Sequence, residues 1–147
     1  MAEADDVQAD FERAQQRWRR AIQAHRMAPP DAGFSERLAE LAGAAAEEAE
    51  ICRRAAAEGY EWPPHKAGGK QPYELQPNTG RRGPEKLWAE FDAAVGELTR
   101  AAAETDLVAV ARAHELIAGA AQRLADAVAE QDRASGLLPS RRRRRSA

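Results

Sequence analysis

The side chains best suited to bind a charged partner are five consecutive arginines near the C-terminal end: Arg141, Arg142, Arg143, Arg144 and Arg145. Adjacent guanidinium groups repel one another in a helix, so we expect this run to stay solvated unless a polyanion neutralises it. The planar guanidinium matches the oxygens of a phosphate, which makes nucleic acid a partner of the right chemistry. The alternative is a tail that stays in solvent or folds back on an acidic body.

A second basic segment, GRRGP at residues 80–84, directly precedes a predicted helix. The first N–H groups of a helix attract an anion, and Arg81 and Arg82 would add to that attraction. The nearby Gly69-Lys70 is not a P-loop, because Gln71 follows it and no strand precedes it. The segment predicts an anion-ligand sensor, a second phosphate contact that assists the arginine run, or a linker without a ligand.

Metal or cofactor chemistry has little support in this sequence. The imidazoles and the single thiol are scattered over three predicted helices and a loop, and no Glu-x-x-His pair occurs on a helix. Paired cysteines, which would indicate zinc, are also missing. We therefore predict no metal and no cofactor for the candidate ligands, which are His25, His65, His114 and Cys52.

Acid–base catalysis would need a buried carboxylate with a raised pKa. Glu47, Glu48 and Glu50 lie close together, but a solvated helix face accounts for them. His114 lies beside an apolar stripe, where we expect a boundary histidine bonded to a side chain or to water. We predict no enzymatic activity and no small-molecule substrate.

Four helices are expected to position these residues, because apolar residues recur every three to four positions along four stretches. The first helix spans about 5–27, and the second runs from an N-cap at Ser35 to about 58. The third begins at Pro84, and the fourth follows an N-cap at Thr105-Asp106 and ends near Gly136. Gly59 and Tyr60 predict a Schellman ending for the second helix. The predicted core stripes are Val7, Phe11, Ala14, Trp18, Ala21 and His25; Phe34, Leu38, Leu41, Ala45, Ala49, Cys52 and Ala56; Leu87, Phe91, Ala94, Leu98 and Ala101; and Val110, Ala113, Ile117, Ala120, Leu124, Ala127 and Gln131.

The fold class predicted is all-α, with two antiparallel helical hairpins in a single domain. Residues 1–62 form the first hairpin, 63–83 a Gly/Pro-rich basic loop, 84–136 the second hairpin and 137–147 a disordered tail. The hairpins would form a four-helix bundle, or an extended antiparallel coiled coil that completes its core by dimerising. The second alternative arises because 35 of the 147 residues are alanine, which buries little apolar area.

Charge is unevenly distributed along the chain. The formal net charge is −2, but without the five tail arginines it is −7, and without the loop 63–83 as well it is −10. An acidic body repels nucleic acid, so only the loop and the tail could attract it. No signal peptide and no apolar stretch long enough to span a membrane is present. With one cysteine, these features predict a cytoplasmic protein that has no membrane partner.

Aromatic side chains are the remaining candidates for partner binding. Trp62 lies in a cluster with Tyr60 and two prolines, which we expect to seal one end of the core rather than to bind a peptide. Tyr73 would pin the long loop to the helices. Trp88 borders an apolar stripe and is expected in the core, although tryptophan is favoured where partners bind. Trp62, Tyr73 and Trp88 are therefore the candidate partner-binding residues.

Taken together, the sequence predicts a non-catalytic helical-bundle protein that acts through protein–protein interaction, including self-association as a homo-oligomer. The alternative from another class is a small nucleic-acid-associated protein that binds phosphates through the tail and residues 80–83. A weaker alternative is the anion-ligand sensor at the start of the third helix.

Overall fold

The computed structural model describes residues 2–27, 33–60 and 82–136, and the side chains of 7–25, 33–60 and 82–136. Every regular element in these ranges is an α-helix: α1 (Ala2–Met27), α2 (Phe34–Ala57), α3 (Glu85–Ala103) and α4 (Leu107–Ser135). The all-α prediction is thereby confirmed for the described part of the chain. The candidate residues Trp62, Tyr73, Arg81 and 141–145 lie outside it.

Two helix ends follow the predicted local chemistry. Gly59 adopts a left-handed conformation with φ 88° at the end of α2. The Tyr60 N–H donates to the Ala55 carbonyl, and the Gly59 N–H donates to the Ala56 carbonyl. These features make a Schellman motif. The side chain of Asp106 caps α4 by accepting a hydrogen bond from the Ala109 N–H at 3.1 Å. These residues fix where α2 ends and where α4 begins.

The predicted N-cap at Ser35 is wrong. The helix α2 already includes Phe34, Gly33 occupies the cap position, and no side chain bonds to the first turn. Phe34 is fully buried in the core, and Ser35 is only 6% exposed inside the helix. Packing of the Phe34 ring therefore sets the first turn, instead of a hydroxyl cap.

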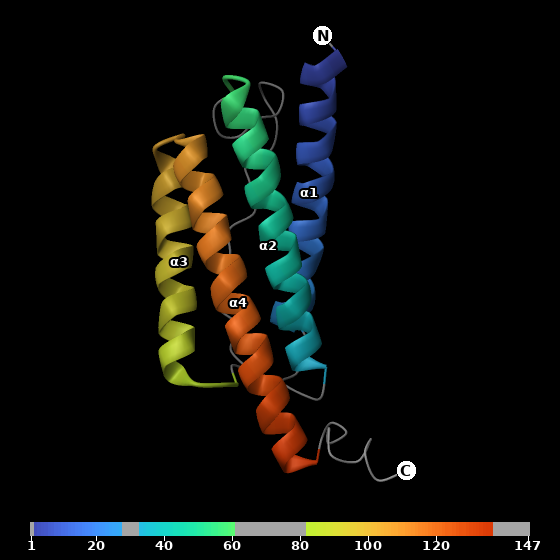
Figure 1. Ribbon diagram of the computed structural model, residues 1–147, viewed down its shortest axis with the longest axis vertical. Coiled ribbons are helices and arrows are strands. Elements are labelled where there is room, and N and C mark those ends of the chain that lie inside the picture. The colour runs from blue at the N-terminus through green and yellow to red at the C-terminus, as the bar shows by residue number, and fades with distance from the viewer. Residues whose placement is uncertain (1, 28–32, 61–81, 137–147) are drawn as a thin grey trace.

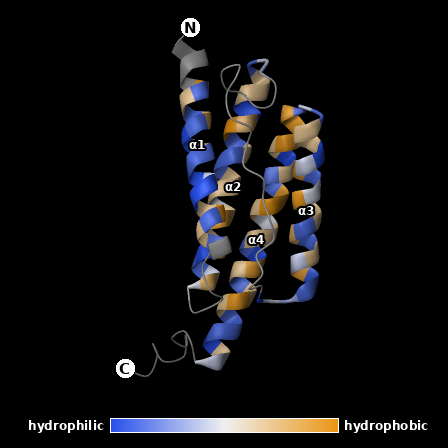
Figure 2. Cartoon of the chain, turned by 180° about the vertical axis from the view of Figure 1, so that it is seen from behind, coloured by the Kyte–Doolittle hydropathy of each residue, from blue (hydrophilic) through white to orange (hydrophobic). Residues whose placement is uncertain are grey.

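The helices α2 and α4 form a central pair, with α1 packed on the outer side of α2 and α3 on the outer side of α4 (Figure 1). Small side chains allow the close approach of the central pair. Hydrophilic and hydrophobic residues alternate along each helix, as expected for packing on one side (Figure 2). The buried alanines of this pair are Ala42, Ala44, Ala45, Ala49 and Ala55 on α2 and Ala111, Ala113, Ala120, Ala121 and Ala125 on α4.

The four helices run in two directions, and the two that are adjacent across the undescribed residues 61–81 run the same way. The helices α2 and α3 run the same way, while α1 and α4 run the opposite way (Figure 1). Tyr60, at the end of α2, packs against one apolar cluster, and Gly83, just before α3, lies beside Val128 of the other cluster. Tyr60 and Gly83 therefore lie at opposite ends of the molecule.

The core consists of two apolar clusters stacked along the helices. The larger contains the aromatic rings of Trp18, Phe34, Trp88 and Phe91 with aliphatic residues of all four helices. The smaller is built around Phe11. The smaller cluster is completed by Val7, Ala14, Ile51, Cys52, Ala55, Ala101, Leu107, Val110 and Ala111.

The predicted stripes match the buried faces well, except at the end of α4. Val128 and Asp132 are fully buried there, whereas Ala127 is half-buried and Gln131 is exposed. A strict alternation of three and four residues drifts by about 20° per heptad relative to a straight α-helix. Over the length of α4 this drift shifts the buried positions by one residue, from the predicted Ala127 and Gln131 to Val128 and Asp132.

Candidate functional site

Three polar side chains are buried at one level, between the two apolar clusters. On each of three helices, one polar residue lies between a residue of the smaller cluster and a residue of the larger cluster. On α1, Gln15 lies between Ala14 and Trp18. On α2, Glu48 lies between Ile51 and Ala45, and on α4, His114 lies between Ala111 and Ile117. Their exposed fractions are 7%, 0% and 1%. We call Gln15, Glu48 and His114 the polar layer.

Glu48 is buried without a strong hydrogen bond. The Cys52 thiol donates weakly to Oε2 at 4.0 Å, and Oε1 has no partner among the described residues. Burial, with a smaller contribution from the neighbouring Glu47 carboxylate, raises the pKa of Glu48 to about 8, against an opposing effect of Arg19 on α1. The carboxyl group of Glu48 is therefore mostly protonated at neutral pH.

His114 is buried as a neutral imidazole. Its ring meets Trp18 of α1 edge-on, with 5.0 Å between the ring centroids. Burial lowers the pKa of His114 to about 3, and its Nδ1 has no hydrogen-bond partner among the described residues. A neutral acid and a neutral base thus lie at the same level of the core.

The expectations for both residues are wrong. Glu48 was expected on a solvated face and His114 at a bonded boundary, but both lie inside the bundle. The reason is that α2 packs against both α1 and α4, so its buried surface is wider than one stripe. A second apolar series with 4-3-4 spacing runs through Glu48 and is the sequence signal that could have found it. That series is Ala44, Glu48, Ile51 and Ala55.

The chemistry available to the polar layer is proton uptake and release. Cys52 is fully buried and burial raises the pKa of its thiol, so the reactive thiolate form is disfavoured. Within the described ranges, no group of three or more His, Cys, Asp or Glu residues could hold a metal ion. Within the polar layer, Glu48 and His114 are therefore the groups whose pKa burial shifts toward the uncharged form.

The predicted anion ligand Arg82 is engaged inside the protein. Its guanidinium forms an ion pair with Asp132 of α4, with Nη1 at 3.4 Å from Oδ2, and lies 5.8 Å from the centroid of the Phe34 ring. Asp132 is fully buried, and Arg82 is 21% exposed. The adjacent Gly83 has φ 114°, and a Cβ there would lie 3.1 Å from Val128. Arg82 and Gly83 thus fix the start of α3 against α4.

The candidate partner-binding residue Trp88 lies in the core and is only 4% exposed. Its indole N–H donates to the Arg82 carbonyl at 2.7 Å. Its ring stacks on His25 of α1 at 6.0 Å between centroids and meets Phe91 edge-on at 5.4 Å. Trp88 and His25 thereby bridge the outer helices α1 and α3, whose backbones do not pack closely.

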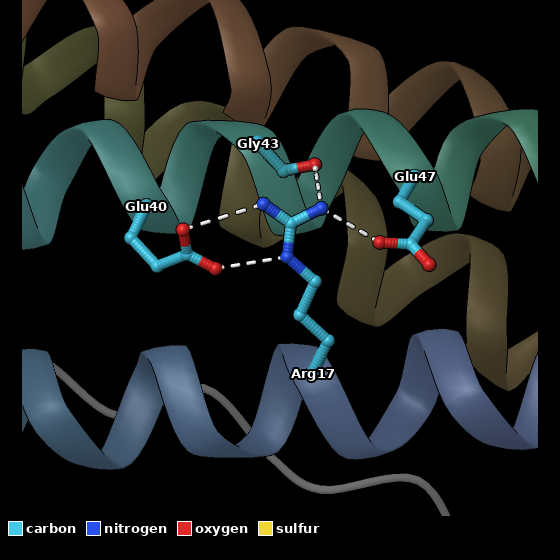
Figure 3. A network of polar contacts seen from close by, with 4 residues as sticks. All are labelled: Arg17, Glu40, Gly43 and Glu47. Atoms are coloured by element: carbon cyan, nitrogen blue, oxygen red, sulfur yellow. Dashed lines mark hydrogen bonds and ion pairs between the residues drawn. The ribbon is translucent and has the colours of Figure 1, made fainter.

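On the other side of α1, Arg17 joins α1 to α2 at the surface (Figure 3). Its Nε donates to Glu40 at 2.8 Å, its Nη1 donates to Glu47 at 2.6 Å, and Nη1 also reaches the Gly43 carbonyl at 3.4 Å. The Arg17 guanidinium lowers the pKa of Glu40. The hydrogen bonds and charges of these four groups are matched within the network, so its role is to hold α1 against α2. We call these contacts of Arg17 the Arg17 clasp.

The outer face of α4 carries the most exposed large apolar side chains among the described residues. Val108 is 56% exposed and Leu116 is 50% exposed. Arg112 lies midway between them, is exposed, and forms no ion pair within the described part of the chain. We call Val108, Arg112 and Leu116 the α4 ridge.

Comparison with protein families, curated proteins and solved structures finds no match to this chain. A search of the described helices finds none that is long and apolar enough to cross a membrane.

Proposed function

We propose that this chain is a non-catalytic, cytoplasmic helical-bundle protein that binds other proteins through the α4 ridge, with a second copy of itself as the first partner. The observation that carries the proposal is the alignment of Val108, Arg112 and Leu116 on one face of α4. Two half-exposed aliphatic side chains around an arginine without an ion-pair partner provide apolar area and charge together. Single exposed apolar residues are common, but an aligned pair beside an unmatched charge is the pattern of an interface.

The spacing of the ridge suits helix–helix packing. Residues four apart form one of the rows that interdigitate when two helices cross. In an antiparallel pairing of two copies, Arg112 would reach the partner's Glu115, which it would share with that chain's own Arg53, and Val108 would lie over the partner's Gly119. Gly119 has no side chain, and a Cβ built there meets only the flexible end of Arg123. A two-fold dimer of this kind is self-complementary.

We further propose that the folded unit is a single-chain four-helix bundle rather than a coiled coil completed by a second chain. Phe11, Ile117 and Leu124 are fully buried within one chain, which supports this arrangement. Dimerisation would then bring together the surfaces of two chains that are already folded, whereas in the coiled-coil alternative the second chain would complete the core.

The experiment is sedimentation velocity of the full chain over a concentration series. The wild type should shift from monomer to dimer, whereas Val108→Glu with Leu116→Glu should stay monomeric with unchanged helical circular dichroism. Ala93→Glu on the exposed face of α3 is the matched control and should dimerise like the wild type. A wild type that stays monomeric at every concentration would refute self-association, and dimerisation of the double variant would refute the ridge as the contact.

Nucleic-acid association through the arginine run remains the alternative proposal. Its support comes from residues 141–145, because Arg82 is already paired with Asp132. The anion-sensor proposal is weakened by the same pairing and would depend mainly on Arg81.

A further inference from the structure

We propose that the polar layer is a proton-sensitive joint: the bundle is closed while Glu48 and His114 are both uncharged, and charging either one loosens α1 from α2 and α4. The proposal concerns conformational control and does not depend on the α4 ridge. It follows from where these groups lie, what surrounds them and which outer helix reaches the polar layer.

The layer lies where the core is least able to accept charge. Glu48 and His114 are between the two apolar clusters and are at most 1% exposed. Glu48 Oε1 and His114 Nδ1 have no hydrogen-bond partner among the described residues. A charge on either group would be desolvated without compensation, which is more costly than a buried neutral polar group.

The groups that face Glu48 give it one route to a partner. On α1 the nearest charge is Arg19, on α2 the neighbours are Glu47 and the Cys52 thiol, and α4 presents His114 at the same level. Leu98 of α3, which borders both clusters, carries no ionisable group. Among the described residues, Arg19 is the cation that lowers the pKa of Glu48, and its buried Nε has no described hydrogen-bond partner. Drawing Arg19 or water inward requires α1 to move.

The helix α1 is an outer helix and the one that contributes to the polar layer. Like α3, which packs closely on α4 alone, α1 packs closely on one neighbour, α2, but Gln15 and Trp18 place α1 at the level of Glu48 and His114. It reaches α4 through the Trp18 ring, which rests against His114. Hydration of a charged imidazole would displace that ring. Ionisation of Glu48 and protonation of His114 therefore act on the same helix from two sides.

The direction of the pH effect follows from proton linkage. The pKa of Glu48 is about 8 in the fold against 4.5 unfolded, so its stabilising proton is fully bound below 4.5 and is lost as pH rises through 8. The pKa of His114 is about 3 in the fold against 6.5 unfolded, so its contribution is full above 6.5 and is lost as pH falls to 3. The two slopes oppose each other between 4.5 and 6.5, where the closed state is favoured most.

The test is amide hydrogen exchange of the full chain from pH 4 to 9, corrected for the intrinsic exchange rate. In the wild type the opening constant of α1 amides should rise by up to tenfold per pH unit between 6.5 and 8, because one proton is released. It should rise less for residues 117–128 of α4. Glu48→Gln should abolish the alkaline rise and keep the acid one.

Glu50→Gln is the matched control, because Glu50 lies on the same helix with its side chain 76% exposed. It should behave as the wild type. An alkaline rise that persists in Glu48→Gln, or that is equal in α1 and α4, would overturn the proposal. Should Glu48→Gln fail to fold, urea unfolding of the wild type decides: stability that does not fall between pH 6.5 and 8 also overturns it.

Discussion

Two carboxyl groups among the described side chains are fully buried, and their surroundings differ. Asp132 is matched by the Arg82 guanidinium, which reaches it from the irregular segment before α3. Glu48 meets no guanidinium at hydrogen-bond distance in the described structure and is held in the protonated form. One buried acid therefore anchors a neighbouring segment, and the other leaves the core sensitive to pH.

The Arg82–Asp132 pair is predicted to be a strong structural contact. Arg82→Met leaves Asp132 buried without its partner and should lower the free energy of unfolding by about 3 kcal/mol. The double variant Arg82→Met with Asp132→Leu should recover most of that loss, because an apolar pair of similar volume needs no desolvation of charge. Urea unfolding measures both.

The control for the Arg82 and Asp132 variants is Glu90→Gln, which removes the exposed ion pair with Arg123. It should lower the free energy of unfolding by under about 0.5 kcal/mol. Additive losses in the double variant would show that the two side chains act independently. Such a result would contradict the structural role assigned to the pair.

Individual buried positions could be predicted from the sequence wherever the side chain is apolar. The stripes through Phe11, Trp18, Leu41 and Ile117 are buried as expected. Glu48 was missed because a charged residue on a central helix looks like part of a solvated face. Asp132 was missed because the strict alternation had drifted off the buried face by the end of α4.

At the scale of the elements, the contact between α1 and α2 depends on a glycine. A Cβ at Gly43 would come within 2.7 Å of Arg17 Nη2, the far end of a flexible side chain. Arg17 can move away, but only by giving up part of its contact with Glu40 or Glu47. A gain in helix propensity and a loss of polar contacts therefore compete at this position.

A matched pair of glycine substitutions separates these effects. Gly96 lies mid-helix in α3, is exposed, and a Cβ there meets nothing within 4 Å. Gly96→Ala should stabilise the protein by about 0.5–1 kcal/mol through helix propensity alone. Gly43→Ala should stabilise it less, or not at all, because the Arg17 clasp is disturbed.

Thermal and urea unfolding of the two variants give the comparison. In an Arg17→Ala background the difference between the two glycine substitutions should disappear, because the clasp is already gone. Equal stabilisation in the wild-type background would mean that the clasp contributes nothing measurable, as many surface ion pairs do.

Helix ends could be predicted where a residue has a distinctive local role. Gly59 and Asp106 act as expected. Thr105 was recognised as part of a break, but its left-handed φ of 54° was not expected, because β-branched residues rarely adopt that conformation. The short turn to Asp106 forces that conformation on Thr105. Local preference therefore yields to the geometry of the hairpin.

At the scale of the whole molecule, composition and periodicity predicted helices but not their neighbours. An apolar stripe indicates that a helix is buried, yet it does not indicate against which partner. The central position of α2 and α4 follows from their many alanines, which allow close packing on two sides. The wider space between α1 and α3 is bridged by the large rings of His25 and Trp88. Both features depend on residues far apart in the sequence.

The last prediction concerns the net charge of the molecule. The chain is acidic apart from its loop and tail, so nucleic-acid binding by the alternative proposal has to come from the loop 63–83 or from residues 141–145, which carry most of that positive charge. Five arginines that each neutralise one phosphate give a slope of log K against log salt of about −4.5 for duplex DNA. Fluorescence anisotropy of a labelled duplex over a salt series should show this slope for the full chain and no measurable binding after deletion of 141–147.

Arg82→Met should leave the slope unchanged, because that guanidinium is already paired with Asp132. A slope that falls by about one unit in Arg82→Met would mean that DNA competes with Asp132 for Arg82. Binding that survives the deletion would exclude the tail as its sole source and would leave the basic loop 63–83 as the remaining candidate.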